Sequence, residues 1–368
     1  ATAAVMTGRL VLAPLSDGGR TALSVALSHL RWGGGDDENT KGFGMRMARQ
    51  WLKVASDQGS ARAAYQLGCM AAGDAETAAW FELGAARGFA KAQCGLAELL
   101  LRRKGGEGRN DPLTFQDECR AVALLESSAA QGYAHAQFVL GQLSSPMERN
   151  ASKNTTTGGL VPSELAAIHY YKMAADQDHV AAQRQLGNIY ARQTPPASKP
   201  RRPPRRPASA GGGRAQSSQA RTSRTQHLAL HYWQRAAKLG DAEAQFNLGR
   251  ALRRAALLAG QRTGAILGNC GEPMDPGRED VEAAQWFARA ADQAHAGARN
   301  ELGCLHWTGG RGVGKSLQKA VAMWEAASAQ GHAVARENLR CAQEVDGVGV
   351  PKGWPLRLRN WKPPNYDT

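Results

Sequence analysis

The residues that most resemble a chemical motif lie in the run Gly309-Gly-Arg-Gly-Val-Gly-Lys-Ser316. This run satisfies the phosphate-binding pattern G-x4-G-K-S, in which backbone N–H groups and a lysine hold nucleotide phosphates. That chemistry needs a strand before the loop and a helix after it, so that the N–H groups converge on the phosphate. Residues 300–307 instead carry a helical pattern, and a turn between repeated units explains the same glycines. We therefore expect no nucleotide binding.

No other constellation in the sequence predicts catalysis or a metal site. The chain contains no metalloprotease helix motif, nucleophile elbow or paired-carboxylate spacing. Its six cysteines include no C-x-x-C pair, so their spacing predicts neither a zinc framework nor a regular disulfide ladder. We expect no catalytic residue, no cofactor and no metal ligand. Four histidines on predicted helices or their edges lack partners at ligand spacing and are interpreted as structural: His169, His179, His227 and His231.

A basic, proline-rich segment is the most unusual stretch of the chain. Between Lys199 and Arg224 there are eight basic residues and no acidic one, which supply more than half of the net charge of +14. The rest of the chain is mildly basic, so the total charge does not indicate a nucleic-acid-binding fold. Three functions stay open for the segment: a solvated tether, a proline-rich ligand for an aromatic groove, or a basic arm for RNA or an acidic surface. The contact residues of such an arm would be Arg201, Arg202, Arg205, Arg206 and Arg214.

The cysteine usage and hydropathy predict a compartment only coarsely. Irregularly spaced cysteines favour free thiols in a reducing environment, and no apolar run reaches the ~18–20 residues of a membrane span. We expect an intracellular soluble protein, with cytoplasm and mitochondrion both open. Two glycosylation sequons, at Asn150 and Asn154, would matter only in a secretory lumen, which is less favoured. Because the first residue is Ala1, the sequence leaves open whether a leader peptide preceded it.

The elements that must position these residues come from one recurring sequence pattern. It consists of an aromatic or apolar pair, a small pair and a glycine, followed by Ala-Gln or Ala-Arg and then Leu-Gly, at nearly constant spacing. The clearest copy runs from Tyr232 to Gly249. The other copies run from Trp51 to Gly68, Trp80 to Ala97, Leu124 to Gly141, Tyr170 to Gly187, Trp286 to Gly303 and Met323 to Arg340.

Each copy predicts a helix, a turn and a second helix. The apolar residues between Ala229 and Ala237 have the spacing of one helical stripe, and Gly240 can adopt the left-handed turn that ends a helix. Asp178 and Ala294 replace glycine at that place in two copies. Gly249 lies inside the second helix at a cost of about 1 kcal/mol relative to alanine, so we expect a neighbouring helix to approach it closely. The glycines that define the repeat on this interpretation are Gly68, Gly88, Gly132, Gly141, Gly187, Gly240, Gly249, Gly303 and Gly331.

The repeat predicts the fold class and the organisation of the chain. A single unit cannot bury its own apolar stripe, so successive units must stack. We therefore predict an all-α protein, an α/α right-handed superhelical solenoid of about seven helix–turn–helix repeats with a concave face. The predicted parts are an N-terminal cap or degenerate repeat (1–44), with a weak helix from Thr21 to Trp32, repeats 1–4 (45–193), a disordered Pro/Arg-rich linker (194–225), repeats 5–7 with a Gly/Pro-rich insertion at about 260–280 (226–350), and a C-terminal tail (351–368).

These repeats resemble the Sel-one-like repeat (SLR) family, which is related to the tetratricopeptide repeats. The resemblance covers roughly residues 45–350, and Trp307-Thr-Gly-Gly-Arg-Gly-Val313 is similar to the Gly-x-Gly-Val loop of that family. Members are adaptors and scaffolds, so the resemblance implies a non-catalytic protein that binds partner proteins on its concave face within a multiprotein complex. The alternative is a structural subunit of a large organellar assembly, such as a mitochondrial ribonucleoprotein, with the basic segment on RNA.

Overall fold

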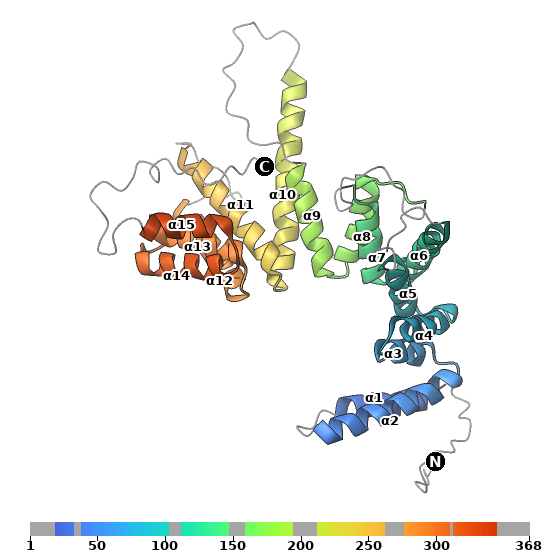
Figure 1. Cartoon of the computed structure of the whole chain (residues 1–368). Helices are drawn as coiled ribbons and strands as arrows, with labels where there is room; N and C mark the ends of the chain where they lie inside the picture. The colour runs from blue at the N-terminus through green and yellow to red at the C-terminus, as the bar shows by residue number, and fades with distance from the viewer. Residues whose placement is uncertain are drawn as a thin grey trace. The chain divides into compact units, whose positions relative to one another are not determined.

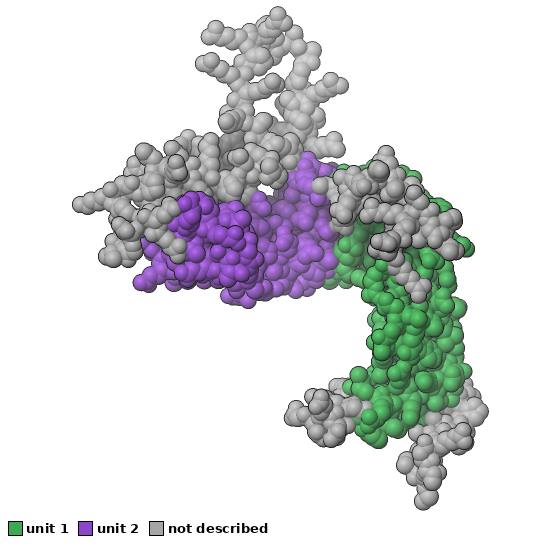
Figure 2. Space-filling view, viewed as in Figure 1, with its two compact units in different colours: residues 1–179 green, residues 180–368 purple. Residues whose placement is uncertain are grey.

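A computed structural model of the chain describes residues 19–32, 38–102, 112–146, 159–193, 212–261, 276–309 and 312–343. In this part of the chain the regular structure is α-helix, and no β-sheet is present (Figure 1). The chain divides into two compact units, residues 1–179 and residues 180–368, coloured green and purple in Figure 2. The prediction of an all-α helical-repeat protein is therefore confirmed.

Each unit is a series of helices in which every helix packs mainly against the one before it and the one after it. This pattern of contacts is that of a solenoid, because neighbours in sequence are also the neighbours that bury each other's apolar stripes. The described helices of the first unit are α1 (Arg20–Trp32), α2 (Glu38–Asp57), α3 (Ala61–Cys69), α4 (Asp74–Ala86), α5 (Ala90–Arg102), α6 (Pro112–Ala130), α7 (Ala134–Ser144) and α8 (Glu164–Ala175). Those of the second unit are α9 (Val180–Arg192), α10 (Gly212–Lys238), α11 (Ala242–Gln261), α12 (Pro276–Asp292), α13 (Ala296–Thr308), α14 (Leu317–Ala329) and α15 (Ala333–Gln343).

The predicted repeat corresponds to a pair of helices. Within the described residues, six copies of the sequence pattern form the pairs α2–α3, α4–α5, α6–α7, α10–α11, α12–α13 and α14–α15. The seventh copy supplies α8, which ends the helices of the first unit, and α9, which begins those of the second. We call the helix with the aromatic pair the first helix of a repeat and the helix with Leu-Gly the second helix.

The turn between the two helices of a repeat has one backbone geometry throughout. In the α6–α7 turn, the N–H of Gly132 donates to the carbonyl of Ala129 and the N–H of Tyr133 donates to Ser128, a Schellman motif. The same two bonds recur in the other six turns. Glycine occupies the left-handed position in five of the seven, whereas Asp178 (φ 59°) and Ala294 (φ 63°) occupy it in two.

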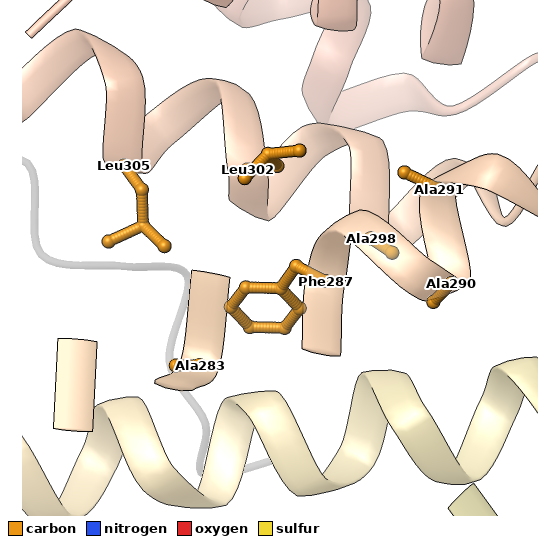
Figure 3. Close-up of a cluster of buried hydrophobic side chains, with 7 residues drawn as sticks. All are labelled: Ala283, Phe287, Ala290, Ala291, Ala298, Leu302 and Leu305. Atoms are coloured by element: carbon orange, nitrogen blue, oxygen red, sulfur yellow. The ribbon is translucent and has the colours of Figure 1, made fainter. Parts of the chain in front are cut away.

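The core is built from small side chains around single aromatic rings, as the cluster in Figure 3 illustrates. The ring of Phe287 is fully buried between α12 and α13, and side chains of α11 and α14 pack against the same cluster. Burial of a phenylalanine side chain stabilises a fold by about 1.5–3 kcal/mol. The cluster consists of Ala283, Phe287, Ala290, Ala291, Ala298, Leu302 and Leu305.

Two of the predicted boundaries need correction. The linker was predicted to extend to residue 225, but α10 begins at Gly212, so residues 212–225 are helical. The physical reason is that Pro207 is the last proline of the segment, and the alanine, glutamine and arginine residues that follow the glycines favour a helix. The first repeat was predicted to begin at residue 45, whereas α2 begins at Glu38.

Other predicted segments fall partly or wholly outside the described residues. They include residues 194–211 of the linker, residues 262–275 of the Gly/Pro-rich insertion and the tail at 351–368. The right-handed superhelix and its concave face stay predictions. No helix in the described ranges is long and apolar enough to cross a membrane.

Candidate protein-binding surface

In the second unit, the second helices of successive repeats contact one another through polar side chains. Asn247 on α11 donates to Asn188 on α9, with a distance of 3.3 Å between Nδ2 and Oδ1. Asn338 on α15 donates in the same way to Asn300 on α13, at 3.0 Å. The ion pair of Arg253 on α11 with Glu301 on α13 joins these two pairs of helices. We call the surface that α9, α11, α13 and α15 form the second-helix face of the second unit.

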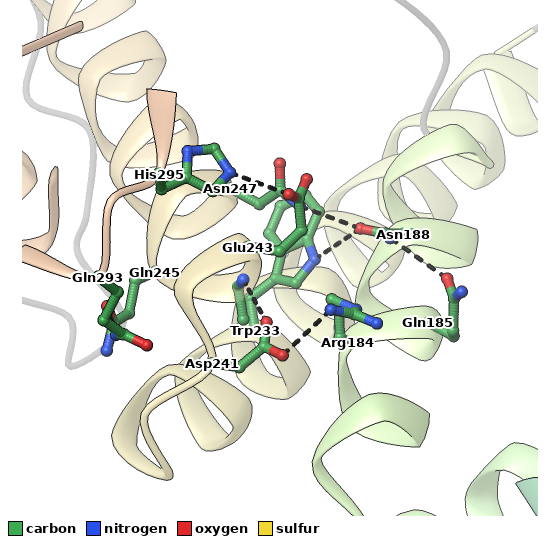
Figure 4. Close-up of polar contacts among 11 residues, drawn as sticks. Arg184, Gln185, Asn188, Trp233, Asp241, Glu243, Gln245, Asn247, Gln293 and His295 are labelled. Carbon is green, nitrogen blue, oxygen red and sulfur yellow. Dashed lines mark hydrogen bonds and ion pairs between the residues drawn. The ribbon is translucent and has the colours of Figure 1, made fainter. Parts of the chain in front are cut away.

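A half-buried hydrogen-bond network crosses the part of this face formed by α9 and α11 (Figure 4). The Oδ1 atom of Asn188 accepts from the indole Nε1 of Trp233 at 3.0 Å as well as from Asn247. The Nδ2 atom of Asn188 donates to Gln185 at 3.3 Å, and that of Asn247 donates to Glu243 at 3.5 Å. The network fixes the orientations of two amide side chains that also face solvent in part.

His295 lies at one end of the network, and its hydrogen bonds define the tautomer of its ring. Its Nδ1 atom accepts the backbone N–H of Ala298 at 3.0 Å and so caps α13. The proton of the neutral ring must therefore be on Nε2, which lies 3.0 Å from the carboxylate of Glu243. This hydrogen bond is the main reason why the pKa of Glu243 is lowered, so the carboxylate keeps its negative charge on the surface at neutral pH.

An ion pair holds the two helices together beside the network. The guanidinium of Arg184 on α9 lies 3.2 Å from a carboxylate oxygen of Asp241. The other carboxylate oxygen of Asp241 accepts the backbone N–H of Ala244 at 2.7 Å and caps α11. The side chain of Asp241 therefore both positions Arg184 and caps the N-terminus of α11.

The recurring glutamine of the sequence pattern connects repeats from inside the fold. The Nε2 atom of Gln245 donates to the carbonyl of Ala237 at 3.1 Å, and its Oε1 atom accepts from Gln293 of the next repeat at 3.0 Å. In the first unit, Gln137 donates to Ala129 and accepts from Gln177 in the same manner, at 3.2 and 2.9 Å. The sequence revealed this position but not its role, because the partners lie about 40 or more residues away.

The glycines of the Leu-Gly pairs, inside the second helices, each face an aromatic ring on the first helix of the following repeat. A Cβ atom built on Gly141 would lie 2.6 Å from the ring of Tyr171, and one on Gly303 would lie 2.7 Å from Trp324. The rings of Phe81 and Trp233 lie equally close to Gly68 and Gly187. The glycines at the helix ends (Gly88, Gly132, Gly240 and Gly331) instead have positive φ and open space around them.

The phosphate-loop pattern has a different structural role. Gly309 ends α13 with φ 67°, so a helix and not a strand precedes the loop. The Oγ atom of Ser316 accepts the backbone N–H of Lys319 at 3.4 Å and caps α14. The described part of the loop thus serves as a helix–helix connection.

The described residues do not bring the five arginines of the predicted basic arm together in one site. Arg201, Arg202, Arg205 and Arg206 lie outside the described residues, and Arg214 lies in the first turn of the α10 backbone. Nothing in the described residues therefore tests whether the arm binds a partner.

The first unit contains a side-chain cluster that no sequence motif predicts. Cys94 and Glu98 on α5 and His135 on α7 place one ligand atom each within 4.8 Å of the other two. Cys94 and Glu98 are four residues apart, which puts them on one helical face. Aligning α5 with α7, the second helices of the two repeats, would have placed His135 opposite the face that carries Cys94 and Glu98. No single sequence motif indicates the cluster.

Together, the stacked helix pairs and their repeated turns define a helical-repeat solenoid. The sequence profile of the Sel1 repeat matches residues 45–60, 90–133, 157–179, 223–241, 242–295 and 296–332, more than half of the chain. The chain therefore belongs to the Sel1 repeat family, and the predicted resemblance is confirmed. The profile matches six segments, one fewer than the seven copies of the sequence pattern. Members of this family are non-catalytic repeat scaffolds that generally mediate protein–protein interactions.

The chain is also similar to solved structures with low sequence identity. A protective antigen of uropathogenic Escherichia coli strains, described as displaying an SLR fold, is 23% identical, with a TM-score of 0.42; the match covers 88% of this chain and 64% of the antigen. A Sel1 repeat protein from Oxalobacter formigenes is 21% identical, with a TM-score of 0.45, and the match covers 88% of this chain and 86% of that protein. No curated protein matches the chain.

Proposed function

We propose that this chain is a non-catalytic scaffold that binds a segment of a partner protein on the second-helix face of the second unit. The observation that carries the proposal is the network of Asn188, Asn247 and Glu243, which presents half-exposed amide and carboxylate groups in fixed orientations on two neighbouring helices. A polypeptide segment offers N–H and C=O groups along its length, and oriented amides can both donate to and accept from them.

Preorganisation is the physical advantage of this surface. A long flexible side chain loses about 0.5–1.5 kcal/mol of conformational entropy when it is immobilised in an interface. Asn188 is already held by Trp233 and Asn247, and Glu243 by His295, before any partner arrives. These side chains are therefore already ordered before a partner binds, so binding loses less of their conformational entropy.

The test compares a double substitution on the second helices with a double substitution on the first helices. Gln185→Ala with Asn247→Ala removes polar groups from the second-helix face, where both side chains are half-buried. Gln234→Ala with Gln285→Ala removes exposed amides from the first helices α10 and α12 and serves as the matched control. Circular dichroism should show the same helix content for all three proteins.

Tagged full-length protein would be used to recover partners from native extract, before and after nuclease treatment, followed by affinity measurement with the purified partner. We expect partners to survive nuclease, affinity to fall at least tenfold in the Gln185/Asn247 variant, and the control to match the original protein. Equal affinity for all three proteins would refute the assigned surface. Loss of every partner after nuclease would refute protein binding and favour RNA contacts of the basic segment.

A further inference from the structure

Three side chains of different chemistry converge between two repeats of the first unit. The thiol of Cys94 is 2% exposed, and the carboxylate of Glu98 lies one helical turn further along α5. His135, the second residue of α7, places its Nε2 atom 2.7 Å from Glu98. The sulfur, nitrogen and oxygen atoms all lie within 4.8 Å of one another.

We propose that Cys94, Glu98 and His135 form a binding site for a divalent transition-metal ion of the zinc type. Zinc takes thiolate, imidazole and carboxylate ligands at about 2.0–2.3 Å, and a tetrahedral arrangement separates such ligands by roughly 3.3–3.8 Å. The Glu98 and His135 atoms lie 2.7 Å apart, so that contact would open when both bind one ion, and the Cys94 sulfur lies within 4.8 Å of each of them.

The mixed ligand set distinguishes this cluster from an ordinary surface ion pair. A half-exposed pair such as Glu98 and His135, with side chains 45% and 42% exposed, adds little to stability because solvent screens its charges. The pair lies beside a buried thiol, however, and calcium or magnesium would not select sulfur. Burial and the neighbouring Glu98 raise the pKa of Cys94 to about 12, so the metal-free thiol is protonated and a bound dication would displace its proton.

The burial of the ligands also suggests how an ion would enter and what it would do. Cys94 forms the closed side of the site, whereas Glu98 and His135 are accessible to solvent. Three protein ligands leave one position of a tetrahedral ion for water. Since α5 and α7 belong to successive repeats, the ion would fasten one repeat to the next, and its binding free energy would add to the stability of the first unit.

Cobalt(II) is the direct probe, because a thiolate–cobalt bond produces a charge-transfer absorption. Full-length reduced protein would be titrated with cobalt and then with zinc as competitor. We expect one equivalent to bind with a thiolate band that zinc removes. Cys94→Ser should abolish the band, and Glu98→Gln or His135→Gln should weaken binding at least tenfold. The buried Cys304, outside the cluster, and the exposed His169 provide matched controls, since Cys304→Ser and His169→Gln should leave binding unchanged.

Thermal unfolding supplies a second readout that does not depend on absorption. Zinc should raise the unfolding temperature of the original protein and of both control variants but not that of Cys94→Ser. The proposal is overturned if the original protein shows no thiolate band, or if Cys94→Ser keeps the band. It is also overturned if Glu98→Gln and His135→Gln, whose half-exposed positions make folding defects minor, bind the metal as tightly as the original protein.

Discussion

The ring of Phe287 occupies the space in which a side chain at position 249 would stand. A Cβ atom on Gly249 would lie 2.7 Å from Cε1 of Phe287, closer than real Cβ contacts allow. Since Phe287 is fully buried among the side chains of α11 to α14, the ring can move only by displacing its neighbours. The glycine of one repeat and the aromatic residue of the next therefore determine how closely the two repeats stack.

Gly249→Ala should destabilise the protein by about 1–3 kcal/mol through overpacking, although alanine is the better helix former. Denaturant unfolding of the two proteins measures the difference. In a Phe287→Leu background the same substitution should cost less, because the smaller side chain leaves room. Gly314→Ala is the control, since nothing lies within 4 Å of a Cβ there, and equal costs at the two glycines would contradict the packing argument.

Ala294→Gly should stabilise the protein. Ala294 has φ 63°, and a left-handed backbone costs a residue with a side chain about 1–2 kcal/mol. Glycine avoids this cost, but its greater conformational entropy in the unfolded state offsets part of the gain. The net gain should be about 0.5–1 kcal/mol, seen as a higher urea midpoint. Gly240, with φ 96° in the equivalent turn, is the reciprocal case: Gly240→Ala should lower the midpoint. A lower midpoint for Ala294→Gly, or an unchanged or higher one for Gly240→Ala, would show that the turn does not favour glycine.

His332→Asn should reduce the loss of stability at acidic pH. The Nδ1 atom of His332 accepts the N–H of Ala335 and caps α15, which requires a neutral ring. Burial lowers the pKa of His332, so the unfolded chain takes up a proton at a higher pH than the folded protein. The stabilising contribution is complete above about pH 6.5 and is lost as pH falls through the lowered folded-state pKa. Asparagine caps without titrating, so the unfolding midpoints at pH 7.5 and 5.5 should lie closer together.

Glu301→Gln should cost about 3–5 kcal/mol, because it leaves the buried guanidinium of Arg253 without a counter-charge. The two side chains are 8% and 9% exposed, and their charged atoms lie 2.5 Å apart between α13 and α11. Replacing both residues, as Arg253→Met with Glu301→Leu, should cost less than the single change. A double variant less stable than Glu301→Gln would show that the ion pair itself, rather than the avoidance of an unpaired charge, stabilises this repeat.

Lys315→Ala should leave stability and partner binding unchanged, and the original protein should not bind ATP. Lys315 is exposed and immediately precedes Ser316, the residue that caps α14. Isothermal calorimetry with ATP and magnesium checks both proteins. Micromolar, magnesium-dependent heat that disappears in the variant would contradict the structural interpretation of the loop.

The sequence by itself determined the helix pairs and the turns inside them, because those features follow from local spacing. Apolar stripes at helical intervals predicted the first helices, and Gly240 predicted the left-handed turn that has φ 96°. The helical continuation before residue 226 was missed, since basic and small residues carry no apolar period there.

Only the tertiary structure decided which side chains meet between repeats. Gln245 and Gln293 are 48 positions apart, and His135 meets Glu98 from 37 positions away. Such separations depend on the length of each connection and on how closely one helix packs against the next. A periodic pattern places each residue on a face of its own helix, but the distance between faces is fixed by packing, here by rings such as Phe287 against glycines such as Gly249.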